Sequence, residues 1–234
     1  MSKIRFDIIT IFPEIFNSYF GESIIKRARE KKLADIHVHN LRAYTPNKHR
    51  KTDDKPYGGG AGMVMLAQPI IKAAEDIINK TKKNKRKKII VFSAKGKQFN
   101  QKSAYDLSRK YDQIIMIAGR YEGIDERVVK ILRAAEVSIG PYVLTDGEIP
   151  AMIVVSAVTR LLPGAIRLDS LQEESHWNLL LKKEKSGKQG EGLEYPHYTR
   201  PEILTHKGKK YKVPKILLSG DHEKIKKWRQ EKSG

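Results

Sequence analysis

Residues 114–133 read IIMIAGRYEGIDERVVKILR, and this stretch decides the fold class. It opens with an apolar run, Ile114 to Ala118, whose continuous rather than alternating pattern is typical of a strand buried on both faces. A glycine-containing turn follows, and apolar residues then recur at helical spacing from Glu126 to Arg133. A buried strand that leads through such a turn into a helix is the repeating unit of an α/β sheet.

The same unit recurs on both sides of this stretch. Apolar runs predict strands at 4–11, 34–41, 89–93, 137–139 and 142–144, and helical spacing predicts helices at 14–32, 68–79, 100–110 and 150–162. The sequence therefore predicts an α/β domain over residues 1–165, with a mostly parallel sheet that helices cover on both faces.

The composition of the sequence changes after residue 165. Residues 166–194 are polar and include a low-complexity insert at 182–192, which predicts a flexible interdomain linker. Residues 195–234 form a short basic segment with a strand-like run at 216–218 and one basic helix. This C-terminal helical extension is too small to hold a core of its own.

The charge of the chain points to a polyanionic partner. The 234 residues include 46 Lys and Arg against 27 Asp and Glu, a formal net charge of +19. Such a surplus favours nucleic acid, because every phosphate that is neutralised releases counterions. Basic residues take seven of the nine positions from Lys80 to Lys88, a run that is either a solvated loop or a contact for RNA.

Several function classes are excluded or disfavoured by what the sequence lacks. The chain has no cysteine, which excludes disulfides, thiolate metal sites and a cysteine nucleophile. It has no G-x-G-x-x-G turn after a strand, no phosphate loop and no H-E-x-x-H helix, and we expect no metal ligands. Neither a signal core nor an apolar run of membrane-spanning length occurs, so we expect a soluble cytoplasmic protein that does not bind membranes.

Three loops follow predicted strands and contain glycines where a backbone turns tightly or approaches a ligand. They are residues 93–96 (SAKG), 119–126 (GRYEGIDE) and 139–150 (IGPYVLTDGEIP). In parallel α/β sheets, ligands bind beyond the carboxyl ends of the strands. If neighbouring strands carry these loops, they converge on one pocket.

Five segments, in the same order along the chain, resemble those of bacterial tRNA (guanine-N1)-methyltransferases, members of the SPOUT class. They are residues 6–13 (FDIITIFP), 53–63 (DDKPYGGGAGM), 119–127 (GRYEGIDER), 139–144 (IGPYVL) and 195–201 (YPHYTRP). The resemblance implies a deep trefoil knot in the carboxyl-terminal half of the sheet and a homodimer whose active sites lie at the subunit interface. It also implies S-adenosylmethionine as methyl donor, with or without assistance by Mg²⁺, and tRNA as acceptor, at N1 of the guanosine 3′ of the anticodon, position 37.

The resemblance also implies a set of site residues. The expected cofactor-binding residues are Ser93, Gly119, Tyr121, Gly123, Ile139, Gly140, Pro141, Tyr142, Val143, Leu144 and Gly147. The expected substrate-binding residues are Glu122, Gly59, Tyr198 and Arg200. The glycines and apolar residues of the first set could alternatively serve only as turn and core residues, and Glu122 could be a helix-capping acid.

Methylation of guanine N1 requires a general base, because that nitrogen carries a proton and its lone pair is delocalised. Positive charge near O6 would stabilise the electron-rich guanine. The resemblance assigns Arg160 as the arginine and Glu174 as the base, with Asp169 and Glu173 as competing carboxylates. An ungapped count from Arg160 falls instead on Ser175, which cannot act as a base at neutral pH.

Two other functions remain open at this stage. One is a non-catalytic RNA-binding protein of the same fold, in which the base has been lost. The other is a SPOUT methyltransferase that acts on a different RNA base.

Overall fold

The computed structural model describes residues 3–46, 48–82, 84–167, 171 and 194–233. The chain divides into two compact units, Met1–Ile166 and Arg167–Gly234, which are considered separately below. The insert predicted at 182–192 lies outside the described residues.

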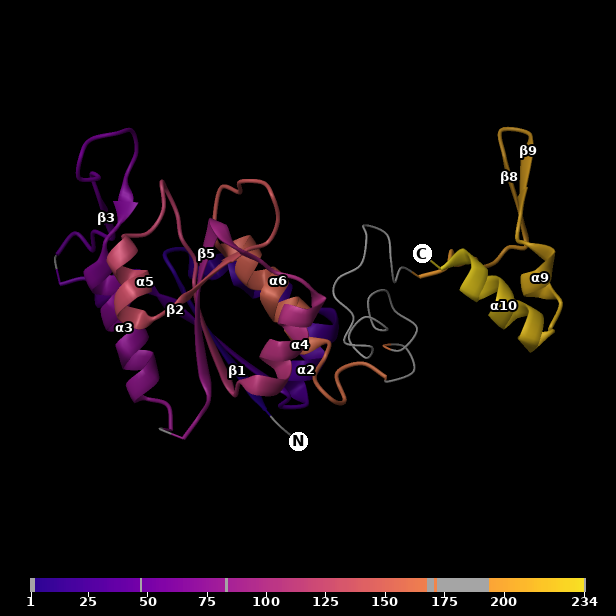
Figure 1. The fold of residues 1–234 in the computed structure, drawn as a ribbon, viewed down its shortest axis with the longest axis horizontal. Helices are drawn as coiled ribbons and strands as arrows, with labels where there is room; N and C mark the ends of the chain where they lie inside the picture. Colours follow the sequence, from indigo (N-terminus) through magenta and orange to yellow (C-terminus); the bar gives the residue numbers. More distant parts are fainter. Residues whose placement is uncertain (1–2, 47, 83, 168–170, 172–193, 234) are drawn as a thin grey trace. The chain divides into compact units, whose positions relative to one another are not determined.

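The first unit is built on a five-stranded sheet with the strand order β2-β1-β6-β5-β7 (Figure 1). Its strands are β1 (Ile4–Thr10), β2 (Ala34–Asn40), β5 (Lys87–Gln98), β6 (Gln113–Ile117) and β7 (Ala135–Ser138). All four strand pairs are parallel, and every residue of the central strand β6 is buried. The predicted α/β class with a mostly parallel sheet is confirmed.

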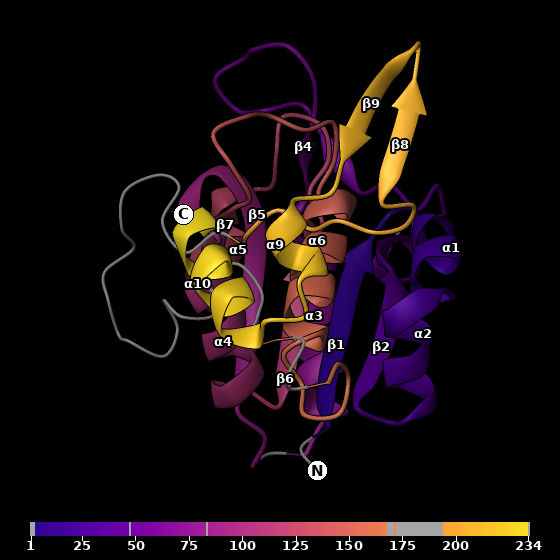
Figure 2. The same ribbon diagram turned by 90° about the vertical axis from the view of Figure 1, so that its right-hand side faces the viewer.

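Helices cover both faces of this sheet (Figures 1 and 2). On one face α3 (Ala67–Asn79) packs against α5 (Glu126–Leu132) and the short 3-10 helix η2 (Leu41–Tyr44). On the other face α6 (Glu148–Thr159) packs against α1 (Phe16–Phe20), α2 (Ser23–Glu30) and α4 (Gln101–Lys110). A 3-10 helix η1 (Pro13–Ile15) precedes α1, and the two-residue strands β3 (Asp53–Asp54) and β4 (Val64–Met65) form a small antiparallel pair.

The core explains why these elements form. Apolar side chains of β1, β5 and β6 pack against α3 and α5 in one cluster, which includes Ile9, Ile70, Ile77, Ile115 and Ile117. Helix α6 is apolar on most of its circumference and buries eight of its twelve residues. A helix that is apolar nearly all round belongs in an interior layer.

Three local predictions in this unit are wrong. The expected helix at 14–32 is interrupted at Gly21 and Glu22, and Ser23 takes a positive φ of 52°. Residues 142–144 form no strand, because this apolar triplet is exposed in a loop instead of pairing with the sheet. Strand β5 continues to Gln98, beyond the expected end at residue 93, through an irregularity in its pairing with β7.

The second unit contains a hairpin and two helices. Strands β8 (Ile203–His206) and β9 (Lys209–Lys212) pair antiparallel, and α9 (Lys215–Leu218) and α10 (His222–Lys232) follow. The strand predicted at 216–218 is therefore wrong, since these residues are helical. The guanidinium of Arg229 lies over the Tyr195 ring, 4.7 Å from the ring centroid, and no residue of α9 or α10 is buried.

Candidate active site

Residues 93–95 and the loops that follow β6 and β7 line a cavity of about 520 Å³ at the carboxyl end of the sheet. We call it the loop cavity. Strands β5, β6 and β7 are neighbours, so the loops after β6 and β7 are brought side by side, as expected. The loop predicted at 93–96 is wrong, because these residues lie inside β5, at the irregularity in its pairing with β7. The expected cofactor-binding residues that line the loop cavity are Ser93, Gly119, Tyr121, Gly123, Ile139, Tyr142, Val143, Leu144 and Gly147.

Two of the loops touch through their backbones. The N–H of Gly147 donates to the carbonyl oxygen of Gly119 at 2.9 Å. A Cβ atom on Gly147 would lie 2.5 Å from the backbone nitrogen of Gly119 and 2.8 Å from Cα of Ala118. Only glycine fits such an approach without moving the backbone, so Gly147 shapes the floor of the loop cavity.

The rim of the loop cavity carries exposed aromatic and apolar side chains. Val143 is 85% exposed, Tyr142 54% and Tyr121 51%. Tyr121 holds a positive φ of 61°, a conformation that non-glycine residues seldom adopt outside functional or tightly constrained turns. Tyr142 folds back over Gly140, and its hydroxyl donates to the carbonyl oxygen of Ile139 at 3.3 Å.

Glu122 lies at the junction between the loop cavity and the glycine-rich loop of residues 58–62. Its N–H donates to the carbonyl oxygen of Met63, and a Cβ on Gly62 would lie 2.4 Å from its carboxylate oxygen. Its expected alternative role as a helix cap is not observed, since Asp125 caps α5 by accepting from the N–H of Arg127. Glu122 thus lines the loop cavity and contacts the glycine-rich loop of residues 58–62. No cation among the described residues forms an ion pair with it.

Carboxylates dominate the charge of the lining. Glu126 and Glu136 both pair with Lys95, at 2.8 and 3.3 Å. The hydrogen bond from Lys95 lowers the pKa of Glu126, and the two carboxylates together raise the pKa of Lys95. The lining also includes Glu122 and Asp146, so the cavity favours a ligand with positive charge.

Asp146 ends the third loop and caps α6. Its Oδ1 accepts from the N–H groups of Glu148 and Ile149, at 2.9 and 3.0 Å. Burial opposes the ionisation of this carboxyl, but the donors, with Ile149 foremost, lower its pKa below the ordinary value. Asp146 therefore fixes the start of α6 beside the cavity.

A buried ion pair beneath the loop cavity was not predicted. Glu148 is fully buried and accepts from the Thr10 hydroxyl at 2.6 Å and from Nε of Arg120 at 3.0 Å. The Arg120 guanidinium also lies over the Phe12 ring, 4.7 Å from its centroid. Burial raises the pKa of Glu148, which the Thr10 hydroxyl and Arg120 oppose. No sequence signal marks this cluster, because its members come from strand and helix ends up to 138 positions apart.

The remaining expected site residues lie elsewhere. Gly140 and Pro141 belong to the third loop without lining the cavity, and Gly59 lies in the exposed glycine-rich loop. Arg160 ends α6, whose twelve residues place it roughly 18 Å along the helix from Gly147. Tyr198 and Arg200 belong to the second unit. Glu174, Asp169, Glu173 and Ser175 lie outside the described residues.

Neither a metal cluster nor a membrane-spanning helix is found in the described part of the chain. No group of three or more His, Asp or Glu side chains there could hold a metal ion. No helix of the described residues is long and apolar enough to cross a bilayer.

Comparison with known proteins identifies the family of this chain. Residues 4–234 match the family described as tRNA (Guanine-1)-methyltransferase TrmD. The chain belongs to this family. The resemblance that five short segments indicated is thereby confirmed over almost the whole length.

Named relatives agree with this assignment. A tRNA (guanine-N(1)-)-methyltransferase of Clostridioides difficile (strain 630) is 48% identical over 231 residues, which cover 98% of this chain and 92% of the relative. Proteins of the same name from Dictyoglomus turgidum and Thermomicrobium roseum are also 48% identical. Those matches cover 98% and 97% of this chain and 85% and 78% of the relatives.

Proposed function

We propose that the protein transfers a methyl group from S-adenosylmethionine to N1 of a guanosine in tRNA, at position 37 beside the anticodon. The observation that carries the proposal is that the loops after β6 and β7 and residues 93–95 of β5 line one cavity in a chain of this family. Family relatives are named for methylation at guanine N1 of tRNA. The choice of position 37 rests on the resemblance of the sequence segments.

The residues of the loop cavity fit the proposed donor. S-adenosylmethionine, when bound, supplies an electrophilic methyl group on a positively charged sulfur. The lining carries more carboxylates than cations (Glu122, Glu126, Glu136 and Asp146 against Lys95 and Arg120), which favours that positive charge. Glu122 forms no ion pair with another described residue. Ile139, Tyr142, Val143 and Leu144 offer apolar surface for the adenine ring, while the glycines leave backbone groups accessible.

The acceptor requires a base and a positive charge. We assign removal of the N1 proton to Glu174 and stabilisation of the developing charge on guanine O6 to Arg160. Glu122, between the cavity and the loop that contains Gly59, is placed to position the incoming guanine. Most of the acceleration would then come from alignment of the nucleophile with the methyl group.

Arg160 can meet the cavity only if a second copy of the chain brings it there. Within one chain the length of α6 separates Arg160 from Gly147. Exposed apolar side chains lie on α6 (Ile149 and Ile153) and on the segment from Phe12 to α1 (Phe12, Ile15 and Tyr19), and α1 packs against α6. Exposed apolar side chains on neighbouring elements are typical of a protein interface, which supports a homodimer in which the partner completes each active site. The trefoil knot stays a prediction.

The residues of the second unit support a role in tRNA binding. Tyr198 and Arg200 are exposed, and basic residues continue through β9 and α10. Aromatic rings and cations side by side suit unpaired bases and phosphates. We propose that this unit holds the tRNA while the first unit performs the transfer.

A methylation assay tests the function. Incubation with labelled S-adenosylmethionine and an unmodified tRNA transcript should give 1-methylguanosine on nucleoside mass spectrometry. A transcript with adenosine at position 37 is the matched control and should accept no label. Another methylated nucleoside would indicate a different target base, and no methylation of any transcript would favour the non-catalytic alternative. Activity unchanged by a chelator would argue against assistance by Mg²⁺.

The base is tested by substitution at Glu174. Glu174→Gln should lower the rate of methyl transfer by roughly 10²–10⁴-fold, with little change in S-adenosylmethionine affinity. Asp169→Asn and Glu173→Gln serve as controls, because they remove neighbouring carboxylates. If one of these two variants loses activity and Glu174→Gln does not, the base is that neighbour.

A further inference from the structure

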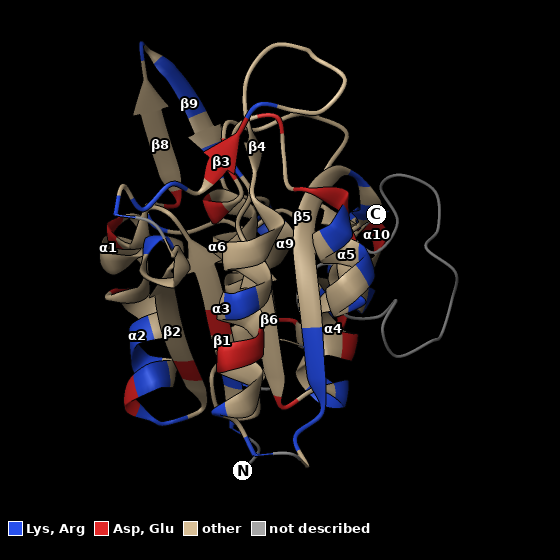
Figure 3. Cartoon of the chain, turned by 90° about the vertical axis from the view of Figure 1, so that its left-hand side faces the viewer, with Lys and Arg blue, Asp and Glu red and all other residues tan. Residues whose placement is uncertain are grey.

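The lysine-rich run lies at the end of the sheet opposite the loop cavity. We call Lys82, Lys85, Arg86, Lys87 and Lys88 the basic edge. Lys87 begins β5, on which the lining of the loop cavity starts only at Val91, and it pairs in register with Gln113, six residues before the cavity residue Gly119. Six residues of extended chain span roughly 20 Å. Figure 3 shows the blue lower end of β5 and the loop that leads into it, far from β3 and β4.

Several cations of the basic edge lack carboxylate partners. Arg86 is paired with Asp112 at 3.1 Å, and Lys80, just before the edge, is paired with Asp76 at 2.7 Å. By contrast, no carboxylate pairs with Lys82, Lys85 or Lys88 among the residues that the structure describes. Some cations of the lysine-rich run are therefore paired with carboxylates, whereas Lys82, Lys85 and Lys88 are available to a partner.

The loop that carries these lysines is ordered by its own polar contacts. The Lys87 ammonium donates to the carbonyl oxygens of Lys82 and Lys85, at 3.1 and 3.4 Å. The N–H of Lys85 donates to the carbonyl oxygen of Lys82, and the N–H of Arg86 donates to Oδ2 of Asp112 at 3.0 Å. Such contacts restrict the described residues of the loop, so less conformational entropy is lost on binding.

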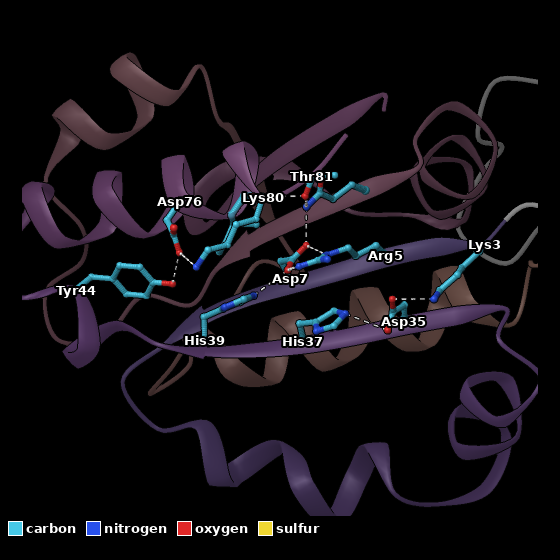
Figure 4. Close-up of polar contacts among 12 residues, drawn as sticks. Lys3, Arg5, Asp7, Asp35, His37, His39, Tyr44, Asp76, Lys80 and Thr81 are labelled. Atoms are coloured by element: carbon cyan, nitrogen blue, oxygen red, sulfur yellow. Dashed lines mark hydrogen bonds and ion pairs between the residues drawn. The ribbon is translucent and has the colours of Figure 1, made fainter. Parts of the chain in front are cut away.

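The basic edge is also anchored to the interior. The side-chain amide of Gln113 donates to the hydroxyl of Thr81 at 3.1 Å and to Oδ2 of Asp7 at 2.7 Å. Asp7 is fully buried and is held in addition by Arg5 and His39 (Figure 4). The start of the lysine-rich loop is thus tied to a buried charge network, unlike a freely solvated loop.

We propose that the basic edge is a second RNA contact, which binds the phosphate backbone of the substrate at a distance from the reacting base. The identity of the RNA rests on the proposed function. Lysine ammonium groups neutralise phosphates as point charges and read no base, so this contact contributes affinity and not the choice of guanosine. Among the described residues between Tyr57 and Tyr121, which include the whole basic edge, no large apolar side chain is exposed, and this favours RNA over a lipid surface as the partner.

The test compares two variants of equal charge. The edge variant carries Lys82→Gln, Lys85→Gln and Lys88→Gln, and leaves Lys87 in place because it orders the loop. The control variant carries Lys26→Gln, Lys72→Gln and Lys130→Gln, at exposed positions in α2, α3 and α5. Circular dichroism and thermal melting check that both variants fold.

Binding of an unmodified tRNA transcript is measured over a series of salt concentrations. The edge variant should reduce the slope of log affinity against log salt by about 2–3, because up to three phosphate contacts are lost. The control variant should keep the wild-type slope. Equal slopes for the two variants would overturn the proposal. If the edge variant does not fold, each single substitution should reduce the slope by about 1 or less, and three unchanged slopes would overturn it equally.

Two further measurements separate the possible outcomes. Loss of binding to phosphatidylserine vesicles, with tRNA binding unchanged, would assign the edge to a membrane and overturn the RNA contact. Methyl transfer to the same transcript is measured in parallel. If the wild-type protein transfers methyl groups and the edge variant binds tRNA like the control variant, the proposed function stands and this inference fails. If the wild-type protein transfers no methyl group but its tRNA binding depends on the basic edge, the proposed function fails and this inference stands.

Discussion

The polar network at each end of the sheet contains one buried carboxylate, and the two carboxyls have opposite pKa shifts. Asp7 lies in the middle of β1 and is bonded to Gln113 at the amino end of β6, whereas Glu148 lies at the carboxyl end; both are 0% exposed. Burial opposes ionisation of Asp7, but hydrogen bonds from His39, Arg5 and Gln113 lower its pKa to about 2. Burial of Glu148 outweighs the Thr10 hydroxyl and Arg120, so its pKa is raised.

The difference follows from the number of donors that surround each group. Asp7 accepts hydrogen bonds from three side chains on three neighbouring strands, so its charge is well compensated. Glu148 has two partners and lies below a cavity floor made of glycine backbone. The amino end is therefore a structural anchor with an ordered cationic surface, whereas the carboxyl end keeps its polar groups less fully compensated around a cavity.

Removing the charge at the amino end should give the largest effect on stability. Asp7→Asn leaves Arg5 and His39 without their carboxylate and should lower the free energy of unfolding by about 3 kcal/mol. Asp35→Asn is the matched control at the same end, because Asp35 is partly exposed and pairs with Lys3 and His37. It should cost at most about 1 kcal/mol. Urea unfolding measures both, and equal losses would contradict the anchor role of Asp7.

The lowered pKa of Asp7 also predicts how stability depends on pH. Its ordinary value of 3.8 falls to about 2 in the folded state, so the folded protein binds the proton less readily than the unfolded chain. The resulting stabilisation, about 2 kcal/mol, is complete above roughly pH 5 and is lost as the pH falls toward 2. Urea unfolding at several pH values should show this loss in the wild type but not in Asp7→Asn.

At the carboxyl end a single added methyl group should matter. Gly147→Ala places a Cβ against the backbone of Gly119 and Ala118 and should cost about 2 kcal/mol. Gly140→Ala is the matched substitution in the same loop, where the obstacle is only the Tyr142 ring, which can rotate away. It should cost less than about 1 kcal/mol. Thermal unfolding gives the order, and a larger loss for Gly140→Ala would contradict the close approach of the two loops.

The raised pKa of Glu148 predicts a smaller effect of opposite sign. The folded state holds the proton more tightly than the unfolded chain, whose carboxyl titrates near 4.5. The stabilisation is therefore present below that pH and is lost as the pH rises through the folded-state pKa. Glu148→Gln should remove this decline of the free energy of unfolding with rising pH. Urea unfolding at several pH values should therefore give different slopes of unfolding free energy against pH for the wild type and the variant, whatever the absolute stability of the variant. A decline that persists in Glu148→Gln would assign it to another group.

Local patterns in the sequence predicted the sheet but not its details. Continuous apolar runs identified the buried strands correctly, because burial on both faces leaves a direct mark on composition. The triplet at 142–144 has the same composition but lies exposed on the cavity rim, so composition alone misassigned it. The hairpin β8–β9 was missed, although Lys207 and Gly208 turn with positive φ values of 47° and 74°. Its strands are exposed and lack an apolar run.

The sequence predicted the parts of the candidate site that consist of glycine turns after strands. It did not predict the contacts between residues far apart in the sequence. Loop residues such as Gly119 and Gly147 could be assigned to one pocket, because neighbouring parallel strands end at the same edge. The pairing of Glu148 with Thr10 and Arg120 could not be read from spacing, since it depends on which strand ends meet in three dimensions. The role assigned to Glu174 stays a prediction, and the assays described above address it.

Hydrogen–deuterium exchange with and without saturating S-adenosylmethionine tests the difference between the two ends most directly. The donor should slow exchange in residues 119–124 and 142–147, which line the loop cavity, and leave residues 80–88 of the opposite end unchanged. Unchanged exchange in both cavity segments, or slowing confined to the basic edge, would contradict the assignment of the cavity.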